Sequence, residues 1–195
     1  MKFKKIVVFC ASSPGHGNTF IQAAEELGKA FVEHNIELVY GGGKVGLMGV
    51  IADSVMNNGG IVTGVIPQFL NSKEIGHSGV TQLIQVDTMH ERKAKMNELC
   101  DAVIAMPGGF GTMEELFEMI TWAQLGLHQK PIGLLNVDGF YDHLILFVQK
   151  MVDAGLLKVE NQNMLLSSDN IEDLLGKMEN YKAPEVPKWL SINKS

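Results

Sequence analysis

The sequence predicts an α/β fold in which a doubly wound parallel sheet carries helices on both faces. Short apolar runs rich in β-branched residues alternate with helical patterns of ten or more residues. Those runs are apolar almost throughout, as in strands that are buried on both faces. Apolar residues make up 46% of 195 residues, which is enough to fill one core. We therefore expect one compact domain over residues 1–180.

The predicted elements alternate regularly along the chain. Six strands are expected at "KIVVFC" (5–10), "IELVY" (36–40), "GIVTGVI" (60–66), "TQLIQV" (81–86), "AVIAM" (102–106) and "PIGLLN" (131–136). Helices are expected at about 18–34, 45–58, 89–99, 112–126, 139–154 and 169–180. Residues 181–195 contain two prolines and little periodicity, so they are expected to form a C-terminal surface arm.

Composition argues against several classes of partner. Sixteen basic and 22 acidic residues give a net charge of −6, which disfavours nucleic acids and anionic membranes as partners. Cys10 and Cys100 have neither CxxC nor metal-ligand spacing, and their apolar surroundings suit buried thiols in a reducing compartment. No apolar run approaches the length of a transmembrane helix. We expect a cytoplasmic protein with no bound metal and no cofactor.

A first glycine loop, "YGGGKVGLMG" (40–49), follows a strand and opens a helix. Gly41, Gly43 and Gly46 satisfy GxGxxG, but no acidic residue follows about 20 residues later to hold a ribose. A nicotinamide or flavin site is therefore disfavoured, and the spacing of a P-loop is absent. A tight strand-to-helix turn is one interpretation. Phosphate binding by backbone N–H groups is the favoured one, because three consecutive glycines exceed what a turn requires.

A second glycine loop, "PGGFGTMEE" (107–115), also follows a strand. One interpretation is purely structural, since Thr112 and Glu115 have the spacing of a helix capping box. The functional interpretation starts from the loop glycines, which leave the backbone open to a ligand. It places Glu114 and Glu115 at the carboxyl end of a central strand, where ligands bind in such sheets. Carboxylates there can bind ribose hydroxyls or direct a water molecule.

The segment "TMHERKAKMNELC" (88–100) predicts a helix with basic residues on its inward face. At 100° per residue, one stripe contains Met89, Arg92, Lys93, Met96 and Cys100. If the methionines face the core, Arg92 and Lys93 face inward as well, and buried cations need partners. Those partners are either structural acids and solvent, or an anionic ligand together with Glu114 and Glu115.

Three segments closely resemble the Lonely Guy family of phosphoribohydrolases: "MHERKAKM", "PGGFGTMEEL" and "ITWAQLGLHQKPIGLLNVDGFYDHL". "FCASSPG" and "YGGGKVGLMG" match two further blocks of that family, and the resemblance runs from about residue 6 to about residue 175. Members are often labelled lysine decarboxylases, but the sequence has no lysine context typical of a pyridoxal phosphate Schiff base. Ala11 and Lys44 depart from the residues common in the family.

The resemblance implies a Rossmann-like fold and a dimer that hydrolyses the N-glycosidic bond of a nucleoside 5′-monophosphate. An N6-modified adenosine monophosphate would release a cytokinin base and ribose 5-phosphate. The family's catalytic positions fall on Arg92 and Glu115. Its substrate-binding positions fall on Ser12, Gly42, Gly43, Met89, Lys93, Gly108, Gly109, Gly111, Thr112 and Glu114.

Two alternatives stay open from the sequence. One is a broader nucleosidase that acts on ordinary purine or pyrimidine monophosphates, and the other is a non-catalytic nucleotide or cofactor carrier of the same fold. A homodimer is also favoured by "LFEMITWAQLGLH" (116–128), a helix that is apolar around much of its circumference. We expect this helix to be buried, with a partner subunit as one possible cover.

Overall fold

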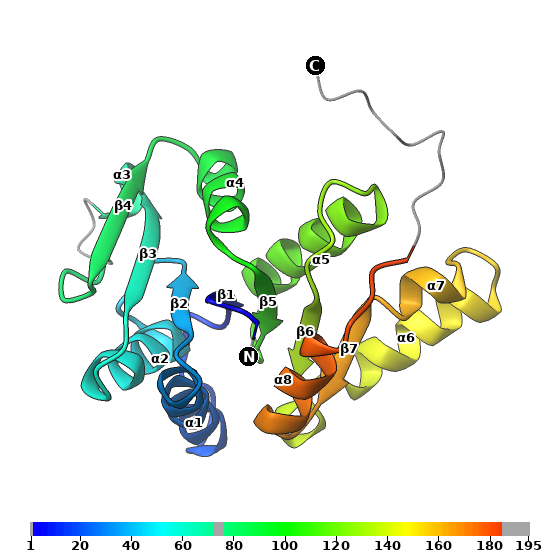
Figure 1. The fold of residues 1–195 in the computed structure, drawn as a ribbon, viewed down its shortest axis with the longest axis horizontal. Helices are drawn as coiled ribbons and strands as arrows, with labels where there is room; N and C mark the ends of the chain where they lie inside the picture. The colour runs from blue at the N-terminus through cyan, green and yellow to red at the C-terminus, as the bar shows by residue number, and fades with distance from the viewer. Residues whose placement is uncertain (1, 72–75, 185–195) are drawn as a thin grey trace.

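The computed structural model describes residues 2–71 and 76–184, and within these ranges it contains a seven-stranded sheet with helices on both faces (Figure 1). The strands are β1 (Lys5–Phe9), β2 (Glu37–Tyr40), β3 (Val62–Pro67), β4 (Gln82–Val86), β5 (Ala102–Ala105), β6 (Ile132–Leu135) and β7 (Leu165–Ser168). Every neighbouring pair of these strands is parallel. The predicted fold class is therefore confirmed.

The strand order places a binding crevice in the middle of the sheet. The order is β4-β3-β2-β1-β5-β6-β7, so the chain builds outward from β1 to β4 and then returns to the other side of β1. In open parallel sheets, ligands bind at the carboxyl ends of the strands where the winding reverses. Here that point lies between β1 and β5.

The helices follow the predicted alternation. They are α1 (Thr19–Glu33), α2 (Gly46–Asn57), α3 (Gln68–Asn71), α4 (Met89–Leu99), α5 (Phe110–Gln124), α6 (Asp142–Asp153), α7 (Val159–Gln162) and α8 (Ile171–Glu179), with a 3₁₀ turn at Val137–Gly139. The sequence did not predict β7, α3 or α7. Helices α3 and α7 are each four residues long, which is too short to show a helical periodicity in the sequence. The edge strand β7, "LLSS", is only half-buried and has two apolar residues.

Alternate strand residues point to opposite faces of the sheet and form two cores. Ile6 and Val8 of β1 join the core beneath α1, α2 and α8, whereas Val7 and Phe9 join the core beneath α4 and α5. All four side chains are almost completely buried. Burial on both faces explains why the strands read as continuous apolar runs.

Residues 181–184 of the expected C-terminal arm follow α8 without forming a helix or strand, and the rest of that arm, 185–195, lies outside the described residues. Cys10 and Cys100 are both buried free thiols, as expected. None of the helices described combines the length and the hydropathy that a membrane crossing requires.

Candidate active site

Helix α4 has a well-defined start that directs its first turns into the crevice. The Thr88 Oγ1 atom accepts a hydrogen bond from the Glu91 N–H at 3.1 Å, and the Glu91 carboxylate accepts one from the Asp87 N–H at 2.9 Å. These reciprocal bonds satisfy N–H groups that the helix itself cannot bond. Met96 is buried in the core, and Arg92 on the same stripe is only 9% exposed. The predicted inward orientation is therefore confirmed for Arg92 and Met96, whereas Met89 at the start of the helix is 37% exposed.

The Arg92 guanidinium is fixed by two hydrogen bonds and one close packing contact. Its Nε atom donates to the Val65 carbonyl at 3.1 Å, and its Nη1 atom donates to Glu115 Oε1 at 2.7 Å. Its Nη2 atom lies where a Cβ of residue 41 would be, so Gly41 is needed for this close approach. Nη2 donates no hydrogen bond within the part of the chain that the structure describes, so its N–H groups are available to a ligand.

The second glycine loop leads into α5 earlier than the sequence predicts. The helix begins at Phe110, Gly109 takes the N-cap position, and Thr112 lies inside the first turn. The capping-box interpretation of Thr112 and Glu115 is therefore wrong, because the turn after β5 is tighter than expected. A Cβ on Gly108 would overlap the Thr112 side chain, so Gly108 is required for the close packing of this turn.

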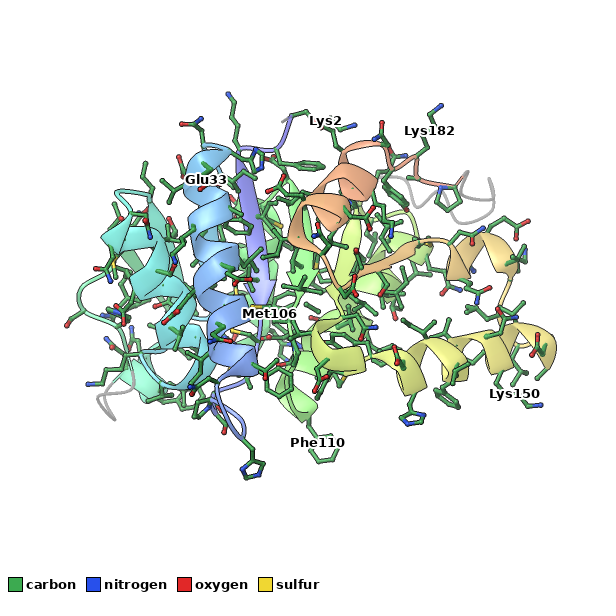
Figure 2. The ribbon with its side chains drawn as sticks, turned by 90° about the horizontal axis from the view of Figure 1, so that it is seen from below. Lys2, Glu33, Met106, Phe110, Lys150 and Lys182 are labelled. Atoms are coloured by element: carbon green, nitrogen blue, oxygen red, sulfur yellow. The ribbon has the colours of Figure 1, made fainter. Side chains whose placement is uncertain are left out.

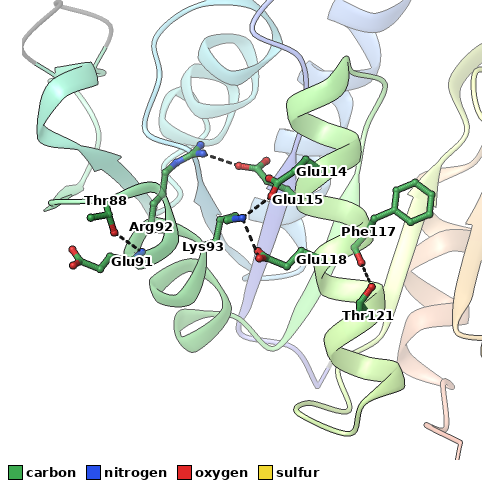
Figure 3. A network of polar contacts seen from close by, with 9 residues as sticks. All are labelled: Thr88, Glu91, Arg92, Lys93, Glu114, Glu115, Phe117, Glu118 and Thr121. Atoms are coloured by element: carbon green, nitrogen blue, oxygen red, sulfur yellow. Dashed lines mark hydrogen bonds and ion pairs between the residues drawn. The ribbon is translucent and has the colours of Figure 1, made fainter.

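Lys93 lies beside Arg92 on α4 and bridges two acids of α5 (Figure 3). Its Nζ atom donates to Glu114 Oε1 at 2.6 Å and to Glu118 Oε1 at 3.0 Å. Both basic residues of the stripe therefore meet carboxylates, and α4 and α5 are joined by three ion pairs next to the crevice. Glu118 was not among the residues expected from the sequence.

Glu115 is a buried carboxyl group in a mixed electrostatic environment. Burial is the largest influence and raises its pKa above the ordinary value. The neighbouring Arg92 and Lys93 charges lower that pKa, while the Glu114 charge raises it. Perturbed carboxyl groups of this kind concentrate at catalytic sites. By contrast, burial strongly raises the pKa of the nearby Cys10 thiol, which makes a poor nucleophile.

A cavity of about 280 Å³ opens at the carboxyl ends of β1 and β5. It is lined by Cys10, Ala11, Ser12, Met48, Met89, Arg92, Gly109, Phe110, Gly111, Thr112, Glu114 and Glu115. A larger cavity of about 510 Å³ lies between α1 and α8, but the buried Arg92–Glu115 pair lies outside it. We assign the candidate site to the smaller cavity because the buried charges face it.

Eight of the residues expected from the sequence line this cavity: Ser12, Met89, Arg92, Gly109, Gly111, Thr112, Glu114 and Glu115. Four others do not. Lys93 contacts the lining residue Glu114, and Gly108 packs against the lining residue Thr112. Gly42 and Gly43 pair with a later segment, since the Gly42 carbonyl accepts from the His77 N–H at 2.9 Å and Gly43 forms a β-bridge with Gly76.

Four residues of the cavity wall were not among the site residues expected from the sequence: Cys10, Ala11, Met48 and Phe110. Two of them flank residues that it did single out, because Ala11 precedes Ser12 and Phe110 lies between two loop glycines. Among the described residues, no group of three or more histidines, cysteines or acids is arranged to hold a metal ion.

A doubly wound sheet whose reversal point combines a glycine loop with a buried guanidinium–carboxylate pair is typical of a nucleotide-binding enzyme. The family model described as "Possible lysine decarboxylase" matches residues 48–178. The chain is 50% identical over 187 residues to cytokinin riboside 5′-monophosphate phosphoribohydrolase LOG2 of Arabidopsis thaliana, covering 96% of this chain and 86% of that protein. It is 51% identical to the probable phosphoribohydrolase LOGL1 of Oryza sativa subsp. japonica, covering 92% and 81%.

The chain therefore belongs to the Lonely Guy family of cytokinin riboside 5′-monophosphate phosphoribohydrolases, which are N-glycosyl hydrolases. A solved structure of the molybdenum cofactor binding protein from Rippkaea orientalis has a TM-score of 0.67 and 20% identity, covering 92% of this chain and 97% of that one. At that identity the likeness concerns the fold alone.

Proposed function

We propose that this chain hydrolyses the N-glycosidic bond of an N6-modified adenosine 5′-monophosphate, releasing the free base and ribose 5-phosphate. The observation that carries the proposal is the buried Arg92–Glu115 pair facing a cavity beside the second glycine loop. The substrate class follows from the names of relatives about half identical over nearly the whole chain. Water is the second reactant, and the scheme assigns every role to side chains and backbone groups of this chain.

Glu115 has the central role in the proposed reaction. Cleavage of an N-glycosidic bond passes through a state in which positive charge develops on the sugar. The Glu115 carboxylate stabilises that charge and orients the attacking water, and its 9% exposure keeps bulk water from weakening the interaction. Glu114, which also lines the cavity, holds ribose hydroxyls.

The remaining residues bind and orient the nucleotide. The N–H groups of Gly109 and Gly111 lie at the start of α5, where the helix dipole favours an anion, and with Thr112 they bind the 5′-phosphate. Arg92 fixes Glu115 through Nη1 and leaves Nη2 for the substrate. Ser12 and Met89 complete the wall around the nucleotide. Gly42 and Gly43 support this wall through their pairing with residues 76–77.

The substrate test uses the purified protein with isopentenyl-adenosine 5′-monophosphate and, separately, with AMP, GMP and CMP. Chromatography resolves nucleotide, nucleoside and free base. Free base with ribose 5-phosphate is the expected product, at a higher rate from the modified nucleotide. Equal rates on all four would replace the proposal with a broader nucleosidase. Free nucleoside would identify a phosphatase, and binding without turnover would identify a carrier.

Glu115→Gln tests the assigned chemistry. The amide keeps an oxygen that accepts from Arg92 but removes the negative charge, so we expect kcat to fall at least about 100-fold with little change in melting temperature. Gln is close to Glu in size, so the fold is expected to tolerate it. A folded variant that retained near wild-type release of base would exclude Glu115 from the role proposed here.

We also propose that the protein is a cytoplasmic homodimer in which residues 1–180 form the catalytic domain and 181–195 a surface arm. In the single chain, the helix expected to be buried leaves Phe117, Leu125 and Leu127 exposed. Leu146 and Phe147 on α6 are exposed too, and Phe110 is 95% exposed and projects away from the ribbon (Figure 2). Exposed apolar side chains on neighbouring surface helices support an interface with a second copy of the chain.

Light scattering tests the assembly. The wild type is expected to be a dimer and Phe147→Asp a monomer, because the added charge would lie in the apolar contact. Asn57→Asp introduces the same charge on an exposed position of α2 and is the matched control. A monomeric wild type would refute the dimer.

A further inference from the structure

Glu118 lies one turn along α5 from the proposed catalytic carboxylate and does not line the cavity. Its Oε1 atom is 3.0 Å from Lys93 Nζ, and its side chain is 24% exposed, against 55% for Glu114. Of the two carboxylates that hold Lys93, Glu118 is therefore the better shielded from solvent. An ion pair is more effective where water screens it less.

The Lys93 side chain is only 10% exposed and lies between the two acids. This placement has two consequences for Glu114, the more exposed of the two acids. The ion pair holds the Glu114 side chain against α4, and the Lys93 charge offsets the Glu114 charge next to Glu115. Lys93 itself does not line the cavity, so it acts through its partners.

The charged and titratable groups that face Glu115 come from three elements. Helix α4 contributes Arg92 and Lys93, helix α5 contributes Glu114, and the loop that follows strand β1 contributes the Cys10 thiol. Burial raises the pKa of that thiol strongly, so it stays neutral. Glu118 reaches this set through its ion pair with Lys93.

We propose that Glu118 is a positioning residue for the hydrolysis: it holds the Lys93 ammonium group against Glu114, and so fixes Glu114 at the cavity and offsets its charge next to Glu115. This inference rests on the proposed function, in which ionised Glu115 does the chemistry. Without Glu118, Lys93 keeps only the half-exposed Glu114 and follows it toward solvent. The Glu114 charge then acts on Glu115 with less compensation.

The test compares Glu118→Ala with Glu118→Gln. The alanine variant removes the acceptor for Lys93, whereas the glutamine variant retains a carbonyl oxygen that accepts from it. We expect the acid limb of the kcat–pH profile to move to higher pH by about half to one unit in the alanine variant, because Glu115 becomes harder to ionise. At acidic pH this lowers kcat about threefold to tenfold. In the glutamine variant kcat is expected to stay within about twofold of wild type.

The direction of the shift separates the possible roles. A direct charge effect of Glu118 on Glu115 would move the limb to lower pH in both variants, and a purely structural role would lower activity without moving it. Either result would overturn the proposal.

Lys93→Met is expected to move the acid limb to higher pH as well, and adding Glu118→Ala to it should have no further effect, since the two residues act as one unit. An additive double variant would also overturn it.

Glu98→Ala is the matched control. Glu98 pairs with Lys95 on the outward face of α4, and its loss should leave the profile unchanged. The Glu115 carboxyl is also titrated by ¹³C NMR of glutamate-labelled protein without substrate, with Glu115→Gln to assign its signal. The pKa of Glu115 obtained from that titration should be higher in Glu118→Ala than in the wild type. If the wild type released no base while this shift was observed, the proposed function alone would be refuted. An unshifted titration would refute the role of Glu118 alone.

Discussion

Replacing Gly41 with alanine would displace the Arg92 guanidinium without removing any of its bonding groups. A Cβ at residue 41 would overlap Nη2 and lie 3.2 Å from Cζ of Arg92, and it would reach the Met48 sulfur at 3.4 Å. Gly41 is not among the glycines with positive φ, so alanine fits the backbone there. The strain therefore falls on the end of the Arg92 side chain, which must retreat by about 1.5 Å to reach ordinary contact distance.

A shift of that size is large compared with the geometry it disturbs. The Arg92–Glu115 hydrogen bond is 2.7 Å long, and a retreat of more than about 1 Å breaks it or carries the carboxylate along. Misplacing a catalytic group by about 1 Å costs on the order of 100-fold in rate. We expect kcat for base release to fall by about that factor. We expect KM to change less, since the groups assigned to the phosphate lie on the other loop.

The assay measures kcat and KM for release of base, together with the melting temperature. Gly176→Ala is the matched control, because a Cβ there meets nothing within 4 Å and alanine favours a helix. A near wild-type kcat in Gly41→Ala, with a structure of the variant showing the guanidinium displaced, would refute the role of Arg92. A large rise in KM at constant kcat would mean that the methyl group obstructs the substrate instead.

The remaining predictions concern stability and are checked by urea unfolding. Tyr141→Phe removes the hydroxyl that donates to the buried Met106 carbonyl at 2.6 Å, and it is expected to cost about 1–3 kcal/mol; no loss would mean that another donor satisfies that carbonyl. His128 is held neutral, since Nε2 donates to the Met119 carbonyl at 3.0 Å and Nδ1 accepts from the Lys130 N–H at 3.2 Å, and burial lowers its pKa below the ordinary 6.5. As pH falls, His128 is protonated in the unfolded chain before it is protonated in the folded protein. The neutral His128 therefore contributes its full stabilisation of the fold above about pH 6.5, and this contribution is lost below that pH. His128→Gln should flatten this dependence, and an unchanged slope would assign it to other groups.

The sequence was informative where burial alone decides the structure. Continuous apolar runs predicted six strands, and the helical stripe predicted that Arg92 faces inward with Met96. It was uninformative where the outcome depends on segments that meet only in the fold. Lys93 pairs with Glu118 because α4 and α5 lie next to each other over the same face, and no local pattern records that contact. The pairing of Gly43 with Gly76 is equally non-local.

The pair at the centre of the site also joins the two halves of the chain. Arg92 and its acceptor Val65 belong to the half built on β1 to β4, while Glu115 follows β5 in the other half. Neither half carries both groups, and contacts between distant segments form late because loop closure costs entropy. Recovery of hydrolysis during refolding therefore reports the docking of the two halves, and it is expected to lag behind the recovery of helical circular dichroism.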